Sequence, residues 1–473
     1  MRRITHYNPL LRRLKMPLCN DIALFEYAYL VSEESGITPI PHEVEAISPL
    51  AFRYLKEMAL GSGQDNRLFR LCKKLGAEAL QVQNYAGVIF TPDGTQVEVL
   101  PKLGRPVQAN DTDTATPSSA ARCEAARHAL LIMLRALREF SHLQTTNANI
   151  RQQKMPLLEV FISQFLDSVN TLVKKGLRSD YVRCEENLSY LKGKLNTARQ
   201  LRQNIITKHK FHCEYDEFLV DRPANRLLHS ALVALAAITR SGNNQRLLQE
   251  LTFIFCEVPL SADYKCDFAR LRIDRGMSHY QTPLAWAKLI LEGFSPQTMS
   301  GGHRAISLLF PMERVFENYV AKTLRATLPP LLTLTAQAQR KHLVSHNDAA
   351  WFRLKPDMVI EQGSKVICVL DTKWKLLDPA KGNGTDKYDL QQGDFYQMFA
   401  YGHHYFDDPD GDREMFLVYP AHRGFQEPIA QPFDFPVAGQ KTMRLWVVPF
   451  MIDAVESRLV LPAQCQLQLR SLQ

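Results

Sequence analysis

Apolar residues recur along the chain with two periods, which separate predicted helices from predicted strands. Helical spacing covers residues 21–32 and 49–60, and it dominates from residue 123 to about residue 175. A further helix is predicted from residue 223 to about residue 239. In the N-terminal hundred residues, Thr-Pro-Asp-Gly-Thr at 91–95 separates two β-rich runs. This turn predicts a hairpin, because proline presets φ and glycine accepts a positive φ.

The last 170 residues alternate between the two periods. The predicted elements are a helix at 312–320, a strand at 332–338, strands at 354–360 and 366–375, a helix at 390–405, and strands at 415–419 and 446–450. This order predicts an α/β arrangement, with a mixed sheet and helices packed on it.

The composition, 45% hydrophobic and 22% charged, is typical of a soluble globular protein. The net charge of +8 is compatible with an anionic partner such as nucleic acid, but it does not require one. The nine cysteines form no C-x-x-C pair, which argues against a disulfide framework or a zinc ribbon and suits a reducing compartment. The N-terminus lacks the apolar segment of a signal peptide, and the longest apolar stretch, 231–238, is too short to span a membrane. We therefore expect a cytoplasmic protein.

The most informative stretch is the pair of β-rich runs at 354–360 and 366–375. The first contains Pro-Asp, ending at Asp357, and the second contains Asp-Thr-Lys, from Asp371 to Lys373. Side chains alternate along a strand, so the acid and the amine of the second run project from one face. Two carboxylates and an ammonium group are thus predicted to meet at one end of the sheet.

This combination suits phosphodiester hydrolysis, which needs an activated water, a neutralised phosphate charge and a stabilised leaving oxygen. Asp357 and Asp371 are the predicted metal ligands, and the backbone carbonyl of Thr372 is a third, because hard divalent cations prefer oxygen. Lys373 is expected to orient or deprotonate the attacking water, or to hold the phosphate. Lys375 lies two residues further along and is the rival amine.

Two neighbouring helices offer further polar groups. Glu317 follows the buried stripe of the helix at 312–320 and is a candidate metal ligand, with a solvated surface acid as the alternative. Gln397 and Tyr401 are four residues apart on the next helix and share one face with Asp394. We expect the Gln–Tyr pair to hydrogen-bond a DNA phosphate or the catalytic lysine.

Each of these motifs alone also fits a solvated strand end or a surface ion pair. Together, their order resembles the PD-(D/E)xK nuclease superfamily, in the branch with a trailing Gln-x-x-x-Tyr. More specifically, the chain resembles the McrC family, the nuclease subunit of McrBC-type modification-dependent restriction systems. The segments that carry this resemblance are 310–320, 355–357, 371–375 and 394–401, with suggestive support from 97–102 and 215–226.

The resemblance implies a C-terminal restriction-endonuclease-like domain whose mixed sheet is flanked by helices, in a chain that is α+β overall. We expect a mixed α/β, partner-docking domain at 1–103, a linker or mobile loop at 104–121, a mainly helical middle region at 122–299 and the nuclease domain at 300–473.

The resemblance also implies a function and a partner. McrC-like proteins cut modified double-stranded DNA in phage defence, with Mg²⁺ (Mn²⁺ as a substitute), together with a GTP-hydrolysing AAA+ ring whose hydrolysis they stimulate. The sequence contains no G-x-x-x-x-G-K-[ST], so we expect no nucleotide site in this chain. Two alternatives stay open: a non-catalytic docking or activator subunit of the motor, and a nuclease of a related repair or defence system. The presence of Asp357, Asp371 and Lys373 together argues against the first.

Overall fold

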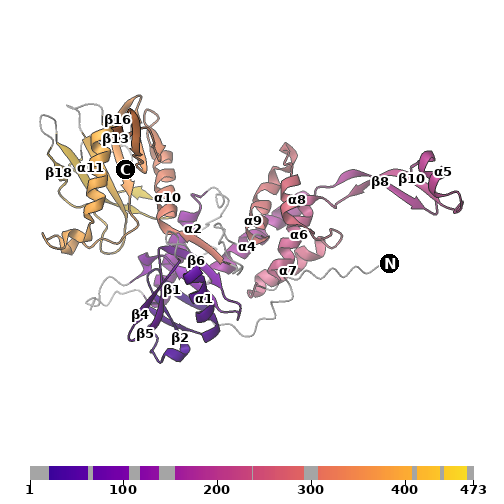
Figure 1. Ribbon diagram of the computed structural model, residues 1–473, viewed down its shortest axis with the longest axis horizontal. Helices are drawn as coiled ribbons and strands as arrows, with labels where there is room; N and C mark the ends of the chain where they lie inside the picture. The colour runs from indigo at the N-terminus through magenta and orange to yellow at the C-terminus, as the bar shows by residue number, and fades with distance from the viewer. Residues whose placement is uncertain are drawn as a thin grey trace. The chain divides into compact units, whose positions relative to one another are not determined.

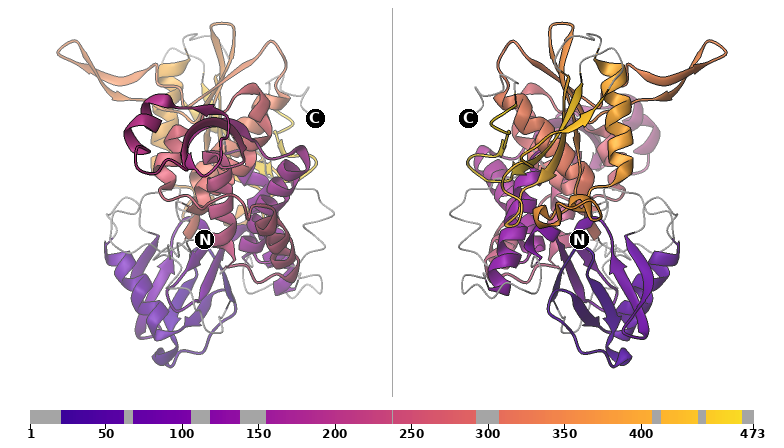
Figure 2. Two further views of the ribbon diagram at one scale, coloured as in Figure 1. Left: turned by 90° about the vertical axis from the view of Figure 1, so that its right-hand side faces the viewer. Right: turned by 90° about the vertical axis from the view of Figure 1, so that its left-hand side faces the viewer.

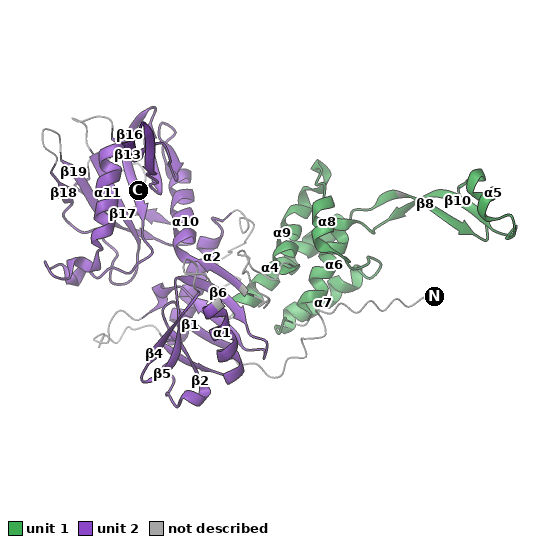
Figure 3. Ribbon diagram, viewed as in Figure 1, with its two compact units in different colours: residues 1–18, 155–298 green, residues 19–154, 299–473 purple. Residues whose placement is uncertain are grey.

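The chain forms two compact units (Figure 3). Unit 1 comprises Met1–Leu18 and Met155–Thr298, and unit 2 comprises Cys19–Lys154 and Met299–Gln473. The computed structural model describes residues 21–61, 68–105, 118–137, 155–236, 238–291, 307–406, 413–436 and 442–465. Among these residues, no helix is both long enough and apolar enough to cross a membrane.

Two four-stranded sheets form the N-terminal part of unit 2, with strand orders β1-β7-β6-β11 and β3-β2-β5-β4. The strands are β1 (Asp21–Phe25), β2 (Tyr29–Ser32), β3 (Val44–Ile47), β4 (Phe69–Lys74), β5 (Ala77–Val82), β6 (Tyr85–Phe90), β7 (Gln96–Leu100) and β11 (Ser307–Pro311). Leu24, Leu30 and Val97 share one buried core with Leu55 of helix α1 (Pro49–Gly61), so the helix holds the two sheets together.

Residues 21–32 form the two strands β1 and β2, so the helix predicted there is wrong. Tyr27, between the strands, has a φ of 63°, a left-handed conformation that no α-helix contains. Apolar spacing over so short a run fits either period, and the pairing of β1 with β7 decides between them. The predicted helix at 49–60 and the hairpin around 91–95 are confirmed by α1 and by the antiparallel pair β6–β7.

A strand from far along the chain completes the N-terminal sheet. β11 pairs antiparallel with β6, and α2 (Ser119–Leu134) packs its Cys123 and Ala126 against Phe25 and Leu100. The segments expected as separate domains at 1–103 and 300–473 therefore lie in one compact unit, and α2 belongs to that unit as well. Of the expected linker at 104–121, residues 106–117 lie outside the described residues.

The C-terminal part of unit 2 is built on a seven-stranded mixed sheet of order β12-β15-β16-β17-β19-β18, with β20 beside β19. Strands β16, β17 and β19 are parallel, and β15 and β18 run antiparallel to their neighbours. The strands are β12 (Thr333–Ala336), β15 (Met358–Gln362), β16 (Lys365–Thr372), β17 (Arg413–Pro420), β18 (Phe433–Phe435), β19 (Met443–Met451) and β20 (Arg458–Leu459).

Helices α10 (Met312–Thr327) and α11 (Gln392–Tyr405) cover opposite faces of this sheet (Figure 2). Val447 of β19 shares a core with Met398 and Tyr401 of α11. Phe450, three residues further along the same strand, meets Phe316 of α10 with ring centroids 6.3 Å apart. Residues three apart on a strand face opposite sides, which places the two helices on different faces. The predicted element order of this region, and the mixed α/β class of the chain, are confirmed.

The sequence did not predict the short strands β18 and β20, nor one larger feature of this region. A two-stranded hairpin, β13 (His342–His346) and β14 (Ala349–Arg353), precedes β15. It pairs with no other strand among the described residues.

Unit 1 contains helices and a three-stranded sheet of order β8-β10-β9. Its elements are α4 (Leu157–Lys175), β8 (Asp180–Leu188), β9 (Lys194–Leu195), α5 (Thr197–Gln203), β10 (Phe211–Leu219), α6 (Pro223–Leu235), α7 (Gly242–Ile254), α8 (Tyr264–Arg270) and α9 (Gln281–Leu291). Buried Glu159 of α4 accepts hydrogen bonds from Thr239 (2.8 Å) and from Asn244 of α7 (2.7 Å), which joins the helices.

The long strands β8 and β10 extend away from the helices of unit 1 (Figure 1). The middle region was expected to be mainly helical, and this sheet is an addition. Apolar alternation in these strands is clear only over residues 211–216 of β10, and charges are frequent: Arg183 lies opposite Asp216 and forms an ion pair with Glu214. Such a short alternating run is a weak strand signal.

Candidate active site

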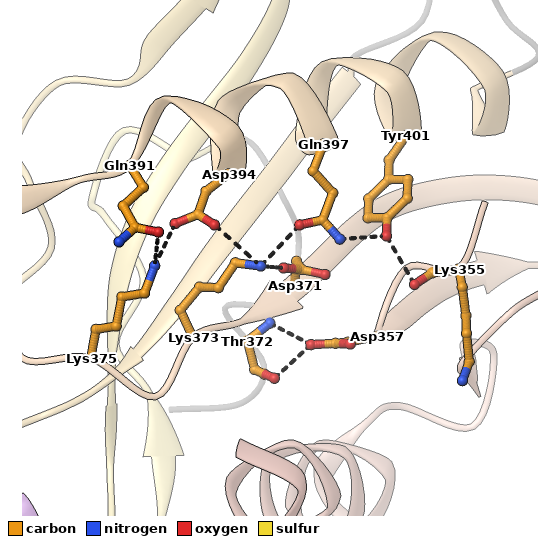
Figure 4. A network of polar contacts seen from close by, with 10 residues as sticks. All are labelled: Lys355, Asp357, Asp371, Thr372, Lys373, Lys375, Gln391, Asp394, Gln397 and Tyr401. Atoms are coloured by element: carbon orange, nitrogen blue, oxygen red, sulfur yellow. Dashed lines mark hydrogen bonds and ion pairs between the residues drawn. The ribbon is translucent and has the colours of Figure 1, made fainter. Parts of the chain in front are cut away.

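The pairing of two strands brings the two predicted aspartates together. β15 and β16 run antiparallel, with Met358 opposite Leu370. The next pair outward is Asp357 and Asp371, at the end of the sheet where β16 runs parallel to β17. Asp371 is only 2% exposed, although its side chain is acidic. The hairpin predicted from sequence therefore forms, and it presents both carboxyl groups at one sheet edge (Figure 4).

Thr372 fixes the orientation of the Asp357 carboxylate. One carboxylate oxygen, Oδ2, accepts a hydrogen bond from the backbone N–H of Thr372 (2.7 Å) and another from its hydroxyl (2.6 Å). Two donors on one oxygen hold the group in a single orientation before any ligand arrives.

The Lys373 ammonium lies among three oxygen-bearing side chains. Nζ is 2.6 Å from Oδ2 of Asp371, 2.9 Å from Oε1 of Gln397 and 3.4 Å from Oδ1 of Asp394 (Figure 4). Strand β16 supplies Asp371, Lys373 directly follows the end of that strand, and α11 supplies the amide and the other acid. The predicted contact between the Gln–Tyr pair and the lysine is thus present in the structure.

Gln397 is itself held by a chain of hydrogen bonds. Its amide nitrogen donates to the Tyr401 hydroxyl (2.7 Å), which donates to the backbone carbonyl of Lys355 (2.9 Å). This chain links α11 to the segment that leads into Asp357, so the amide oxygen of Gln397 is aimed at Lys373 rather than at solvent. Tyr401 itself is buried, and burial raises its pKa to about 12, so the hydroxyl remains protonated.

The rival amine has a different environment. Lys375 Nζ contacts Oε1 of Gln391 (2.8 Å) and Oδ2 of Asp394 (3.1 Å). Asp394, which the sequence grouped with the Gln–Tyr pair, therefore bridges the two lysines. The structure brings Lys373, and not Lys375, to the carboxylate of Asp371.

Burial sets the protonation behaviour of the site. Desolvation, together with the charge of Asp357, raises the pKa of Asp371 to about 7. Desolvation also raises the pKa of Asp357, although the hydrogen bonds from Thr372 oppose it. For Lys373, burial alone would lower the pKa, but the facing carboxylates, Asp371 first, outweigh burial and the net pKa is raised. The site therefore holds a charged ammonium beside acids that are reluctant to ionise without another cation.

Glu317 lies next to this site but is not grouped with the two aspartates. It accepts a hydrogen bond from the side chain of Gln337, whose backbone N–H donates to the carbonyl oxygen of Asp357 (2.7 Å). Burial and the charge of Asp357 raise the pKa of Glu317. Among the described residues, no three His, Cys, Asp or Glu side chains form a ready-made metal cluster. Any cation here would rely on Asp357, Asp371 and a backbone oxygen, a donor set that fits a hard divalent ion.

Sequence reasoning missed a buried cluster directly behind the site. The indole N–H of Trp374 donates to both carboxyl oxygens of Glu26 (3.1 and 3.0 Å), and the backbone N–H of Lys102 donates to one of them (2.9 Å). The Lys102 ammonium in turn donates to the backbone carbonyl of Trp374. This cluster ties the N-terminal sheets to the residue that follows Lys373. Glu26 and Trp374 are 348 positions apart, so no local sequence pattern predicts the contact.

The fold and this site together define a mixed α/β protein with paired carboxylates and a lysine at the edge of its largest sheet. The family model of the McrBC 5-methylcytosine restriction system component matches residues 80–420, which include every site residue from Glu317 to Tyr401. The chain belongs to this family.

A solved assembly contains a chain of similar fold. A chain in the refined half-complex from the tetradecameric assembly of Thermococcus gammatolerans McrB AAA+ hexamers with bound McrC is similar, with a TM-score of 0.63 and 18% identity, over 96% of this chain and 98% of that one. A chain of the Thermococcus gammatolerans McrBC complex is similar at a TM-score of 0.45 and 19% identity, over 66% of this chain and 88% of that one. No curated protein matches the sequence.

Proposed function

We propose that this chain is the Mg²⁺-dependent DNA endonuclease component of an McrBC-type, modification-dependent restriction system, with a PD-(D/E)xK nuclease domain in the C-terminal part of unit 2. The observation that carries the proposal is the convergence of Asp357, Asp371 and Lys373 at one sheet edge. Membership of the restriction-system family supports the reaction class.

The residues of the site would have separate roles in metal binding and in contacting the substrate. Asp357, Asp371 and the carbonyl of Thr372 would hold the metal, which activates water and neutralises phosphate charge when bound. Asp357 needs little reorganisation for this, because Thr372 already orients it. The Lys373 ammonium is then available to a phosphate oxygen or to the attacking water. Mn²⁺ is expected to replace Mg²⁺.

Two helices complete the arrangement. Gln397 and Tyr401 fix the position of Lys373 through the hydrogen-bond chain to Lys355. Glu317 accepts a hydrogen bond from Gln337 through one carboxylate oxygen. It would therefore act from further out, on a metal-bound water rather than as a direct ligand.

We further propose that the chain works with an AAA+ GTPase ring. The sequence has no phosphate-binding loop of its own, and the similar Thermococcus gammatolerans assembly contains McrB AAA+ hexamers with bound McrC. The ring would recognise and move along modified double-stranded DNA. This chain would dock on it through the N-terminal and middle regions and stimulate its hydrolysis.

The test is cleavage of methylated and unmethylated plasmid DNA by this chain with its AAA+ partner, Mg²⁺ and GTP or ATP. Asp371→Ala and Lys373→Ala are each expected to abolish cutting while the partner's nucleotide hydrolysis stays stimulated. Lys375→Ala is the matched control, since it removes an amine two residues from Lys373 that does not contact Asp371.

Two outcomes would contradict the proposal. Cutting by both the Asp371 and the Lys373 variants would place the chemistry elsewhere. A wild-type chain that stimulates the motor but never cuts would make it a docking and activating subunit.

A further inference from the structure

The β13–β14 hairpin exposes an unusual amount of apolar surface. Trp351 is 48% exposed and Phe352 is 68% exposed, and Leu343 and Val344 on the other strand are also exposed. Every residue of β14 is exposed, so neither face of the ribbon packs on a core. The hairpin stands out from the C-terminal sheet near α11 (Figure 2). An isolated two-stranded ribbon is only marginally stable in water, so its apolar surface suggests a partner.

The backbone presents one of these rings at an energetic cost. Phe352 has a φ of 55°, in the left-handed region that bulky side chains rarely adopt. The ladder is interrupted at this position: His342 pairs with Arg353 and Val344 pairs with Trp351, whereas Phe352 and Leu343, which lie opposite each other between them, form no ladder pair. Strained conformations of this kind are concentrated at functional surfaces.

The hairpin is anchored beside the candidate active site. At its base, the backbone N–H of Leu354 donates to the carbonyl of Lys341 (3.0 Å), and Leu354 is buried. The next carbonyl, that of Lys355, accepts the Tyr401 hydroxyl that also holds Gln397. Two residues later comes Asp357. Whatever binds the ribbon therefore lies close to the predicted scissile position.

The charge around the ribbon identifies the kind of partner. Residues 339–356 contain four cationic side chains and a single acid, Asp348, at the tip. One of the four, Arg340, forms an ion pair with Glu361 (2.7 Å). Arg353 and Lys355 at the base are exposed on the approach to Asp357. Cationic side chains at the foot of the hairpin suit the phosphates of DNA, and the aromatic rings further along it suit the stacked bases.

We infer that the β13–β14 hairpin is a DNA-binding wedge: Trp351 and Phe352 contact the bases of the duplex next to the cleavage site, while Arg353 and Lys355 contact its phosphates. This inference rests on the proposed function, because it places DNA at the same site. The alternative occupant is a second copy of the chain, and the experiment separates the two.

Tryptophan fluorescence tests the contact directly. Of the four tryptophans, Trp286, Trp374 and Trp446 are at most 3% exposed, so Trp351 is the one that a solute can reach. In the full chain carrying Asp371→Ala, which prevents cutting, a saturating 30-base-pair duplex should quench Trp351 emission and shield it from acrylamide. Trp351→Phe should abolish this signal. Binding is thus measured without cleavage, and the result stands even if the chain proves not to be a nuclease.

Affinity provides the second readout. Trp351→Ala and Phe352→Gly are each expected to weaken duplex binding about tenfold, the usual scale for losing one ring that stacks on a base. Glycine at position 352 accepts the positive φ, so this variant removes the ring and keeps the backbone conformation. Arg353→Gln and Lys355→Gln should each reduce the slope of the log binding constant against the log salt concentration by about one. Leu331→Ala, which removes a 75% exposed side chain elsewhere in unit 2, should leave binding unchanged.

Two results would overturn the inference. Unchanged Trp351 emission on a saturating duplex, with Trp351→Ala and Phe352→Gly binding as tightly as their parent, would show that DNA does not touch the hairpin. Emission that instead changes with protein concentration in the absence of DNA, together with dissociation of a dimer in the same variants, would assign the surface to a second copy.

Discussion

Lys102 provides the positive charge for a carboxylate that is buried completely. Glu26 is fully buried, and Lys102 is largely buried. Burial raises the pKa of Glu26 above its ordinary value of 4.5, and the charge of Lys102 is the strongest influence that opposes this rise. Replacing Lys102 by methionine keeps the volume but removes the charge. We expect this change to destabilise unit 2 by about 2–3 kcal/mol at pH 7, somewhat below the usual range for breaking a buried pair.

The magnitude follows from protonation of Glu26. Without the lysine, the folded state avoids an isolated buried charge by protonating the carboxylate. From a pKa of 4.5, this costs about 3.4 kcal/mol at pH 7, at about 1.36 kcal/mol per pH unit. Part of that cost is already present in the wild type, because the pKa of Glu26 is raised there too. The lost hydrogen bond from Lys102 to the Trp374 carbonyl adds about 1 kcal/mol.

A matched double variant separates charge from packing. In Glu26→Gln/Lys102→Met, an amide oxygen can still accept the hydrogen bonds from the Lys102 backbone N–H and the Trp374 indole, and no charge is buried. The double variant should therefore be more stable than Lys102→Met alone, by about 2 kcal/mol at pH 7.

The pH dependence has a definite sign. A carboxyl group with a raised folded-state pKa binds its proton more tightly in the native state than in the unfolded state. Its contribution to stability is therefore present at low pH and is lost as the pH rises above 4.5 towards the folded-state pKa. The loss of stability of Lys102→Met relative to the wild type should grow from pH 5 to pH 7. Adding Glu26→Gln to this variant should remove that pH dependence.

Hydrogen exchange of the β1 and β16 amides, measured across a urea series, reports the stability of unit 2 separately from unit 1. A double variant less stable than Lys102→Met would refute the reasoning. So would a loss below about 0.5 kcal/mol for Lys102→Met at pH 7, the usual scale of a surface substitution.

Three further predictions concern the site. Lys373→Ala should lower the single-turnover cleavage rate by at least about 10²–10³-fold, whereas Lys375→Ala, whose amine pairs with Asp394, should stay within about tenfold of the wild type in the same assay. Tyr401→Phe, which breaks the hydrogen bonds to Gln397 and to the Lys355 carbonyl, should slow cleavage about tenfold and lower stability in thermal unfolding by about 1 kcal/mol. Glu317→Gln should leave Mn²⁺ affinity in calorimetry within about twofold, because its carboxylate binds Gln337 outside the aspartate pair; a loss of about tenfold would make it a direct ligand.

Sequence patterns predicted which residues converge at the candidate site because local geometry determines it. Strand alternation and antiparallel pairing suffice to bring Asp357 and Asp371 together. The helical spacing of four residues places Gln397 next to Tyr401. The choice between Lys373 and Lys375 needed the structure, because both follow one strand end and both contact Asp394. What separates them is that Lys373 contacts Asp371 and Gln397, whereas Lys375 contacts Gln391.

Features that depend on distant segments were beyond sequence reasoning. The Glu26–Lys102–Trp374 cluster joins three widely separated positions. Residues 21–32 carry apolar spacing that fits a helix, yet pairing with β7 makes their first half a strand. The extended pair β8–β10 is rich in charged residues and has only a short alternating apolar run, so hydrophobic periodicity gives little sign of it.

The central claim is that Asp357, Asp371 and the Thr372 carbonyl hold a catalytic divalent cation. Anomalous scattering from crystals of the protein soaked in Mn²⁺ tests this most directly. We predict one strong peak about 2.1 Å from an oxygen of each of these three groups, absent in Asp371→Asn. A peak at another position, or no peak at saturating Mn²⁺ in crystals of the wild type, would contradict the account.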